Sequence, residues 1–313
     1  MVLLKYCSQI TNFLSIEYMA PQKKYLFIVN PISGDVDKTE MIEQTLAFAS
    51  ENNSEVFIFE TSEADCKKEI HDLYEMHLPE RVLIAGGDGT IKMVAEALEN
   101  QDVIFGILPA GSANGLAVDL DLPKTIEENL EIAFNGDFIA MDMIEINGLK
   151  SLHLSDIGLN AQLVKNYEQG NTRGKLGYAL QAITTLIDAQ EPFSAIIQSH
   201  GVGIDCSAKM IVIANSQKYG TGVTINPNSQ MNDGKFEIII LKNLDLLVFG
   251  KIITGNMPVN TDDVQIISTD KATITTDKPI SFQIDGEYCG EESVLNINIL
   301  PGKIKVAIPK KVI

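Results

Sequence analysis

The sequence lacks the features that define membrane-spanning and exported proteins. No apolar stretch approaches the roughly 20 residues that a helix needs to cross a bilayer, so we expect no transmembrane segment. Residues 1–22 contain one lysine and no continuous hydrophobic centre, which is not typical of a signal peptide. These absences predict a cytoplasmic protein.

Cysteine and histidine are scarce and scattered. The four cysteines, Cys7, Cys66, Cys206 and Cys289, form no C-x-x-C pair, and the sequence has only four histidines. This pattern is typical of reduced thiols and does not indicate a disulfide framework or a zinc site.

Positive charge is scarce as well. The chain has 24 Lys and Arg against 42 Asp and Glu, a formal net charge of −18. Such a surface repels the phosphates of nucleic acid and disfavours broad attraction to an anionic membrane. A local basic patch, for example around Arg173 and Lys175, stays open, and the net charge also favours solubility.

The first half of the sequence contains an alternation of predicted strands and helices. At 313 residues and 45% hydrophobic composition it can build two domains. After a tail over residues 1–22, short apolar runs alternate with helical spacing, which predicts a Rossmann-like nucleotide-binding domain over 23–137 with a parallel sheet. Its ligand crevice is expected beyond the carboxyl ends of the strands. The predicted strands are 25–29, 56–59, 81–85 and 103–108, and the predicted helices are 40–50, 64–77, 91–98, 116–120 and 126–134.

A change of pattern at Phe138 predicts a second, β-rich domain over 138–300. Alternating runs, one of them covering 264–275, are separated by turn signals such as Asn147-Gly148 and Asp285-Gly286. Helical stretches are predicted at 175–188 and 244–254, and residues 301–313 are expected to return to the first domain. The predicted fold class is therefore α/β plus β.

The stretch Leu83-Ile-Ala-Gly-Gly-Asp-Gly-Thr90 is the first candidate site. Its glycines leave no Cβ to block a ligand, and the amide groups at the start of the following helix favour a phosphate. Asp88 would repel that phosphate unless a cation or a donated proton intervenes, which suggests metal-assisted or acid–base chemistry. The alternative is an ordinary turn at which glycine ends a strand.

Three further turns are expected at the same edge of the sheet. They are Asn30-Pro-Ile-Ser-Gly34, the turn at Thr61, and Pro109-Ala-Gly-Ser-Ala-Asn-Gly115. Four turns rich in glycine and small hydroxyl residues at neighbouring strand ends favour a functional crevice over chance.

Five motifs resemble, in order and spacing, the diacylglycerol kinase catalytic domain family, which includes bacterial lipid kinases and sphingosine and ceramide kinases and, more distantly, NAD kinases. The resemblance covers roughly residues 23–309 and implies a C-terminal β-sandwich that binds lipid, with the active site in the cleft between the domains. The motifs are Asn30-Pro-x-Ser-Gly34, Gly86-Gly-Asp-Gly-Thr90, Pro109-x-Gly-Ser-x-Asn114, Asn232-Asp-Gly234 and Asp285-Gly-Glu287.

The resemblance implies an ATP site along the strand-end turns. Gly87 and Gly89 would permit close approach of phosphate, and the Thr90 and Ser112 hydroxyls would donate to it. Arg173 matches a phosphate-binding arginine of some lipid kinases, although a surface arginine is the alternative. The full implied set is Asn30, Pro31, Ser33, Gly34, Thr61, Gly86, Gly87, Asp88, Gly89, Thr90, Lys92, Ser112, Asn114 and Arg173.

The implied reaction is transfer of the γ-phosphoryl group of ATP to a hydroxyl of diacylglycerol or a related lipid, with Mg²⁺ as cofactor. Asp285, Glu287 and Asp88 are the catalytic candidates, since this reaction needs a carboxylate to accept the alcohol proton. Asp285 is favoured as base and Asp88 as the group that handles metal or substrate hydroxyl; the reverse assignment, or a plain hairpin at Asp285-Gly286, stays open.

A second ion is implied at Asp233, where bacterial members hold a divalent cation with carbonyls near Gln230 and Lys235. A plain turn is the alternative.

Three departures from the family pattern qualify the prediction. Lys92 and Met93 stand where many members have Asn-Glu, and Asn114-Gly115 replaces Asn-Asp, which is nearer to sphingosine and ceramide kinases and favours a sphingoid base as acceptor. A non-catalytic nucleotide- or lipid-binding homologue and an NAD kinase are the alternative functions. The expected partner is a lipid at a membrane surface, with which the protein associates transiently. A homodimer stays open.

Overall fold

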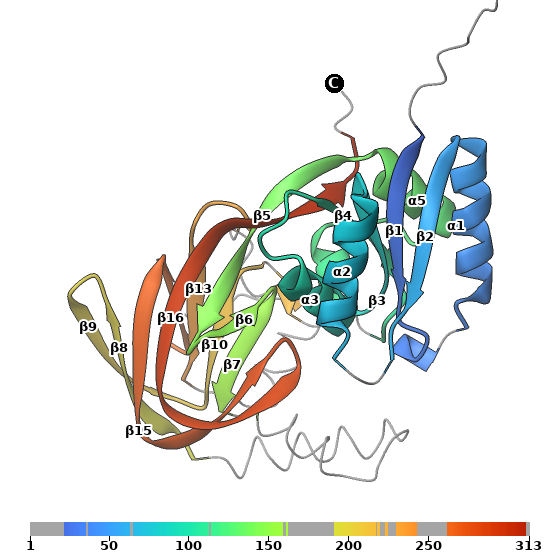
Figure 1. Cartoon of the computed structure of the whole chain (residues 1–313). Coiled ribbons are helices and arrows are strands. Elements are labelled where there is room, and N and C mark those ends of the chain that lie inside the picture. Colours follow the sequence, from blue (N-terminus) through green and yellow to red (C-terminus); the bar gives the residue numbers. More distant parts are fainter. Residues whose placement is uncertain are drawn as a thin grey trace, which may run out of the picture.

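The computed structural model describes residues 22–35, 37–62, 65–112, 114–158, 161, 191–216, 218–219, 223–224, 230–242 and 262–310. Figure 1 shows these residues as two lobes that lie side by side. No helix among them has the length and apolar content needed to span a membrane. The predicted helices at 175–188 and 244–254 and the candidate Arg173 lie outside the described residues.

Four parallel strands form the sheet of the first domain, in the order β4-β3-β1-β2. The apolar run of β1 is buried on both faces, as expected of a central parallel strand. The elements are β1 (Lys23–Val29), a 3-10 turn η1 (Ser33–Asp35), α1 (Thr39–Glu51), β2 (Ser54–Glu60), α2 (Lys67–His77), β3 (Arg81–Gly86), α3 (Asp88–Ala97), β4 (Ile104–Pro109), α4 (Gly115–Asp119) and α5 (Ile126–Asn135).

Helices cover both faces of this sheet. Leu26 and Ile28 of β1 pack into the core beneath α2 and α3, whereas Tyr25 and Phe27 pack into the core beneath α1 and α5. The alternation follows from the two-residue period of a strand. The register pairs Val29 with Ala85, and Gly86 with Pro109, so the turns after β1, β3 and β4 begin at one edge of the sheet.

Antiparallel strands build the second domain around a core of isoleucine and phenylalanine. Its hairpins β5–β6 and β15–β16 turn at Asn147-Gly148 and Asp285-Gly286, with positive φ at all four residues. The strands are β5 (Asp137–Ile146), β6 (Leu149–Ser151), β7 (Leu154–Gly158), β8 (Phe193–Ser199), β9 (Val202–Ala208), β10 (Met210–Ala214), β11 (Lys218–Tyr219), β12 (Val223–Thr224), β13 (Phe236–Leu241), β14 (Val264–Thr269), β15 (Lys271–Ile284) and β16 (Glu287–Ile308).

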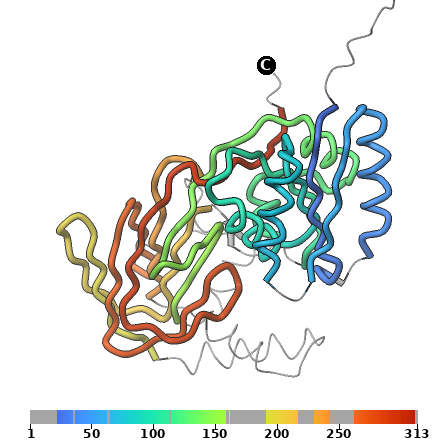
Figure 2. The backbone as a smooth tube through the Cα atoms, viewed as in Figure 1, coloured from blue at the N-terminus to red at the C-terminus, as the bar shows by residue number. Residues whose placement is uncertain are grey.

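Strand β16 joins the two domains. It pairs with β15 and β5 in the second domain, and then Lys305 and Val306 pair in parallel with β4 of the first. Figure 2 shows this red segment running back beside the first domain. The core beneath α3 also continues into Met141 and Met143 of β5, so the junction is packed as well as hydrogen-bonded.

The predicted fold class, α/β plus β, is confirmed, with two local corrections. The run 264–275 was predicted as one strand, but the chain turns at Asp270 and forms β14 and β15. The hairpin at His200-Gly201 was not predicted, although both residues have positive φ and connect β8 to β9. Histidine is an uncommon residue in such a turn, so the composition signal was weak.

Buried Arg81 caps the carboxyl end of α5. Its guanidinium donates hydrogen bonds to the carbonyls of Ile132, Ala133 and Gly136 at 3.5, 3.3 and 2.8 Å. We expect Arg81→Met to lower the free energy of unfolding by about 2 kcal/mol, because buried carbonyls would lose a charged donor. Urea denaturation measures the effect. The control Lys23→Met breaks the exposed Lys23–Glu80 pair and should cost less than about 1 kcal/mol; equal losses would show that Arg81 does not cap α5.

Candidate active site

The turns after β1, β3 and β4 are bound to one another. Asn30 Nδ2 donates to Thr90 Oγ1 at 2.9 Å, which links the first turn to the glycine-rich turn. Ser33 Oγ donates to Ala110 O at 2.9 Å, which links it to the turn after β4. The three predicted turns therefore form one continuous surface.

Glycines allow these backbones to touch. A Cβ at Gly111 would lie 2.4 Å from Gly87 Cα, and a Cβ at Gly34, where φ is +66°, would lie 2.7 Å from Ala110 O. Because α3 begins at Asp88, the amides of Asp88 and Gly89 have no carbonyl of their own helix to bind. The result is a backbone surface that suits an anion such as phosphate.

Asp88 caps the neighbouring helix α4. Its Oδ2 accepts from Gly115 N at 2.8 Å and its Oδ1 accepts from Leu116 N at 3.0 Å. The positive end of α4 therefore stabilises the carboxylate, which explains how an aspartate is accommodated in the glycine-rich turn. Asn114, at φ 53°, closes the same loop through two hydrogen bonds with Gly111.

The predicted hydroxyl groups differ in exposure. Thr90 and Thr61 are 4% and 6% exposed, so they face the protein interior. Ser112 and Pro31 are exposed at the rim. Of the predicted hydroxyl donors, Ser112 is thus the one that a ligand reaches without rearrangement.

The Asp285 carboxylate is enclosed by backbone. Its side chain is 3% exposed. Oδ1 accepts hydrogen bonds from Ser151 Oγ and from the amides of His153 and Leu154, and Oδ2 accepts from Leu152 N, all at 3.0 Å. Asp285 therefore fixes the segment 151–154 that leads into β7.

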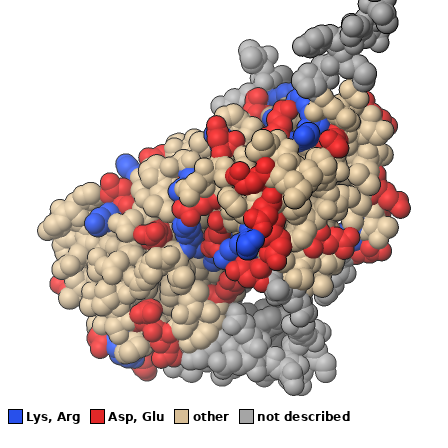
Figure 3. All heavy atoms as spheres, in the orientation of Figure 1, with Lys and Arg blue, Asp and Glu red and all other residues tan. Residues whose placement is uncertain are grey.

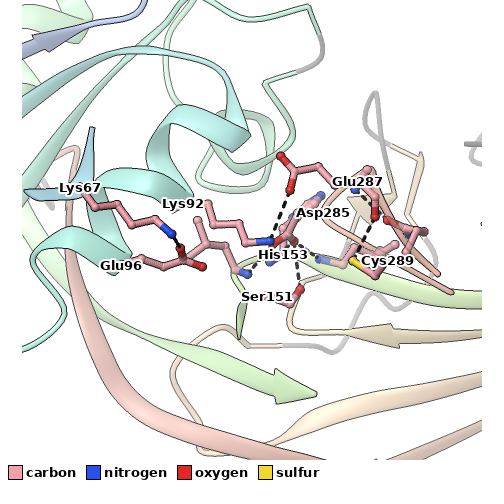
Figure 4. Close-up of polar contacts among 12 residues, drawn as sticks. Lys67, Lys92, Glu96, Ser151, His153, Asp285, Glu287 and Cys289 are labelled. Carbon is pink, nitrogen blue, oxygen red and sulfur yellow. Dashed lines mark hydrogen bonds and ion pairs between the residues drawn. The ribbon is translucent and has the colours of Figure 1, made fainter. Parts of the chain in front are cut away.

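Glu287 is the exposed carboxylate of the same hairpin. Its side chain is 66% exposed, and its Oε2 lies 3.9 Å from Lys92 Nζ. Lys92 Nζ also lies 3.9 Å from Asp285 Oδ2. Figure 4 shows Lys92 extending from α3 toward both carboxylates. A Cβ at Gly89 would lie 3.7 Å from Glu287 Oε1, so this carboxylate stands beside the glycine-rich turn.

Further ion pairs hold α3 against the second domain. Glu99, just beyond α3, contacts Lys150 and also Lys303, the latter at 3.0 Å. Within the first domain, Lys67 of α2 pairs with Glu96 of α3 at 2.7 Å. In Figure 3, basic and acidic side chains lie next to one another between the lobes. The junction is therefore a mixed-charge surface, in which lysines are paired with carboxylates.

His153 and Asp119 are at the junction, although the sequence did not single them out. His153 Nδ1 lies 2.7 Å from Asp119 Oδ2, and both side chains are buried. A single histidine in an alternating run carries no spacing signal. Only the fold brings these two residues together.

The predicted ion site near Asp233 stays a prediction. Asp233 Oδ1 accepts from Lys235 N at 3.0 Å, which forms a tight turn, and Gln230, Asp233 and Lys235 are exposed. Buried Asp142 accepts from Gly234 N at 2.7 Å beside it. Among the described residues, no group of three or more His, Cys, Asp or Glu is arranged to hold a metal ion.

Fold and site together define a class of protein: a Rossmann-like domain with glycine-rich turns at one edge of its sheet, joined to a β-sandwich that presents carboxylates to that edge. Residues 24–146 match the diacylglycerol kinase catalytic domain, and residues 154–308 match the YegS C-terminal NAD kinase beta sandwich-like domain. The first domain therefore belongs to the diacylglycerol kinase catalytic domain family, and the second is similar to the YegS C-terminal domain.

Proteins similar to this chain include a bacterial lipid kinase and solved bacterial structures. Lipid kinase YegS of Escherichia coli (strain K12) is 28% identical over 241 residues, which cover 73% of this chain and 78% of that protein. A solved structure of a diacylglycerol kinase from Bacillus anthracis str. Sterne has a TM-score of 0.74 at 22% identity and covers 94% of this chain and all (100%) of its own. A second chain from that organism has a TM-score of 0.77, also at 22% identity, with coverage of 93% and 98%. These two structures share the fold.

Proposed function

We propose that this protein is an ATP-dependent lipid kinase that transfers the γ-phosphoryl group to a hydroxyl of diacylglycerol or a related lipid. The observation that carries the proposal is the position of Glu287, an exposed carboxylate of the second domain that stands beside Gly89 of the glycine-rich turn. Phosphoryl transfer needs this combination of phosphate-binding amides and a nearby proton acceptor.

The nucleotide phosphates fit the surface formed by the turns at Asn30–Gly34, Gly86–Thr90 and Pro109–Asn114. The contact between Gly87 and Gly111 leaves backbone amides in place of side chains at its centre. Lys92 supplies positive charge at its edge, and Ser112 supplies an exposed hydroxyl. We therefore propose that these three turns, together with Lys92 and Ser112, form the ATP site.

Mg²⁺ would be held chiefly by the phosphates, since it commonly takes only one or two protein carboxylates. The oxygens of Asp88 and Asp285 accept backbone hydrogen bonds, which leaves Glu287 as the carboxylate with oxygens exposed toward the turn. When bound, the ion neutralises charge that develops on the phosphate oxygens.

The two carboxylates of the Asp285-Gly-Glu287 turn have different parts in this proposal. Asp285 holds the hairpin and the segment 151–154 in place, and Glu287 accepts the proton of the lipid hydroxyl. This assignment differs from the sequence-based preference for Asp285 as base. Exposure decides it, because a bulky acceptor must reach the base.

We expect Gly111→Ala to weaken ATP binding at least tenfold. The new Cβ would lie 2.4 Å from Gly87 Cα, and because that neighbour is backbone, the two turns must separate. Calorimetric titration with ATP and Mg²⁺ measures the affinity. The matched control is Gly203→Ala, whose Cβ meets nothing within 4 Å. Unchanged affinity in Gly111→Ala would place the nucleotide elsewhere.

The acceptor is tested with a panel of diacylglycerol, monoacylglycerol, sphingosine and ceramide, each incubated with the full chain, ATP and Mg²⁺. We expect one or more phosphorylated lipids, and the Asn114-Gly115 sequence makes the sphingoid base a specific arm. Formation of NADP in a parallel reaction with NAD would instead identify an NAD kinase. ATP binding without any transfer would identify a non-catalytic homologue.

For location we propose a cytoplasmic enzyme that contacts the membrane transiently to reach its lipid. Lys92, Lys150 and Lys303 at the junction supply local positive charge that supports contact at this face despite the net charge of −18.

A further inference from the structure

His153 contacts both domains at the junction. Its backbone N–H donates to Asp285 Oδ1 at 3.0 Å within the second domain. Its imidazole Nδ1 lies 2.7 Å from Asp119 Oδ2 at the end of α4 in the first domain. Figure 4 shows the ring next to Asp285, below Glu287. One residue thus joins the turn of the β15–β16 hairpin to α4.

Gly115 makes room for the imidazole. A Cβ at Gly115 would lie 2.8 Å from His153 Nε2 and 3.3 Å from Asp88 Oδ2. Gly115 N donates to that same Asp88 oxygen. The ring therefore packs against the first turn of α4, at the point where Asp88 caps it. Any side chain at position 115 would displace either His153 or Asp88.

The charges around His153 favour the imidazolium. Burial disfavours the charged ring, but its contact with Asp119 and the negative charges of Asp119, Asp88 and Asp285 together raise the pKa of His153 above 6.5. The nearby cation is Lys92, whose Nζ lies 3.9 Å from Asp285 Oδ2. His153 thus stands among carboxylates from α3, α4 and the β15–β16 turn.

We propose that His153 is a positioning residue that, as an imidazolium, holds the Gly86–Thr90 turn of the first domain and the Asp285-Gly-Glu287 turn of the second in one fixed arrangement. The contacts run from Asp88 through the amides of α4 to Asp119, then through the ring and backbone of His153 to Asp285. The proposal depends on the proposed kinase function only where it predicts an effect on turnover; its predictions for stability do not depend on that function.

We expect His153→Gln to lower kcat by roughly 10- to 100-fold, because loss of the ring would displace the two turns slightly from their reactive arrangement. The KM for ATP should change less. Wild-type activity should fall as pH rises from about 6 to about 9, and the variant should lose this dependence. His200→Gln is the matched control, because His200 forms an exposed pair with Asp270 on the β8–β9 hairpin.

Stability gives a readout that does not depend on turnover. Because the folded pKa exceeds 6.5, stabilisation by His153 is fully present below about pH 6.5 and is lost as pH rises through the folded pKa. The difference in thermal midpoint between wild type and His153→Gln should therefore shrink from about pH 6 to about pH 9. Asp119→Asn is a second variant that removes the charge partner while keeping the ring.

The outcomes separate the two proposals. If the wild type turns over and His153→Gln has the same kcat and the same pH profile, the positioning role is overturned and the kinase function still holds. Absence of turnover in every variant overturns the kinase function; the pH dependence of stability then decides the role of His153 alone. A thermal difference that stays constant with pH in both His153→Gln and Asp119→Asn overturns the proposed imidazolium.

Discussion

Asp285→Asn is expected to cost both stability and turnover. In the wild type one buried carboxylate accepts four hydrogen bonds, three of them from consecutive backbone amides of residues 152–154. An asparagine side chain would direct its NH₂ group at these donors, which leaves buried amides unpaired. We expect a loss of about 3 kcal/mol in unfolding free energy and no measurable transfer to lipid.

Urea denaturation of the full chain measures the stability, and lipid phosphorylation at saturating ATP measures turnover. If Asp285→Asn lost turnover at unchanged stability, Asp285 would act as the base predicted from the sequence, and its enclosure by residues 151–154 would have no structural consequence.

Glu287→Gln, in contrast, should lower turnover with little loss of stability. The side chain is 66% exposed and its Oε2 lies 3.9 Å from Lys92 Nζ, so its charge adds less than about 1 kcal/mol to stability. Removal of a proton acceptor should lower kcat by about 100-fold or more. Steady-state kinetics with the lipid acceptor measure the effect.

Glu292→Gln is the control for this change. Glu292 is an exposed glutamate further along the same strand β16, and its substitution should leave kcat within about twofold of wild type. Equal activity in Glu287→Gln and Glu292→Gln would remove Glu287 from the mechanism and return the choice of base to Asp285.

Local patterns in the sequence predicted the fold class well. The apolar run Tyr25–Val29 indicated a strand buried on both faces, and Asn147-Gly148 and Asp285-Gly286 indicated hairpins, because these features depend on residues that are neighbours in sequence. The strand-end turns were predicted to share one edge, since parallel strands bring their carboxyl ends together.

The sequence indicated which residues are candidates for the site, but it did not indicate how they are arranged. Nothing local indicates that Asp88 caps a helix 27 residues further on, or that Asp285 binds amides more than 130 residues earlier. Thr90 and Ser112 have the same chemical group, yet one is buried and the other exposed. His153 carried no signal, because the fold of the second domain brings Asp285 to it and the docking of the two domains brings Asp119.

The most direct measurement of the central proposal is the fate of the terminal phosphate of ATP. Full-length protein, Mg²⁺ and ATP labelled at the γ-phosphate are mixed with diacylglycerol or a sphingoid base in detergent micelles, and the label in lipid is compared with the ADP formed. The proposed mechanism predicts one labelled lipid phosphate for each ADP. ATP bound by the folded protein with no label in any lipid would contradict it.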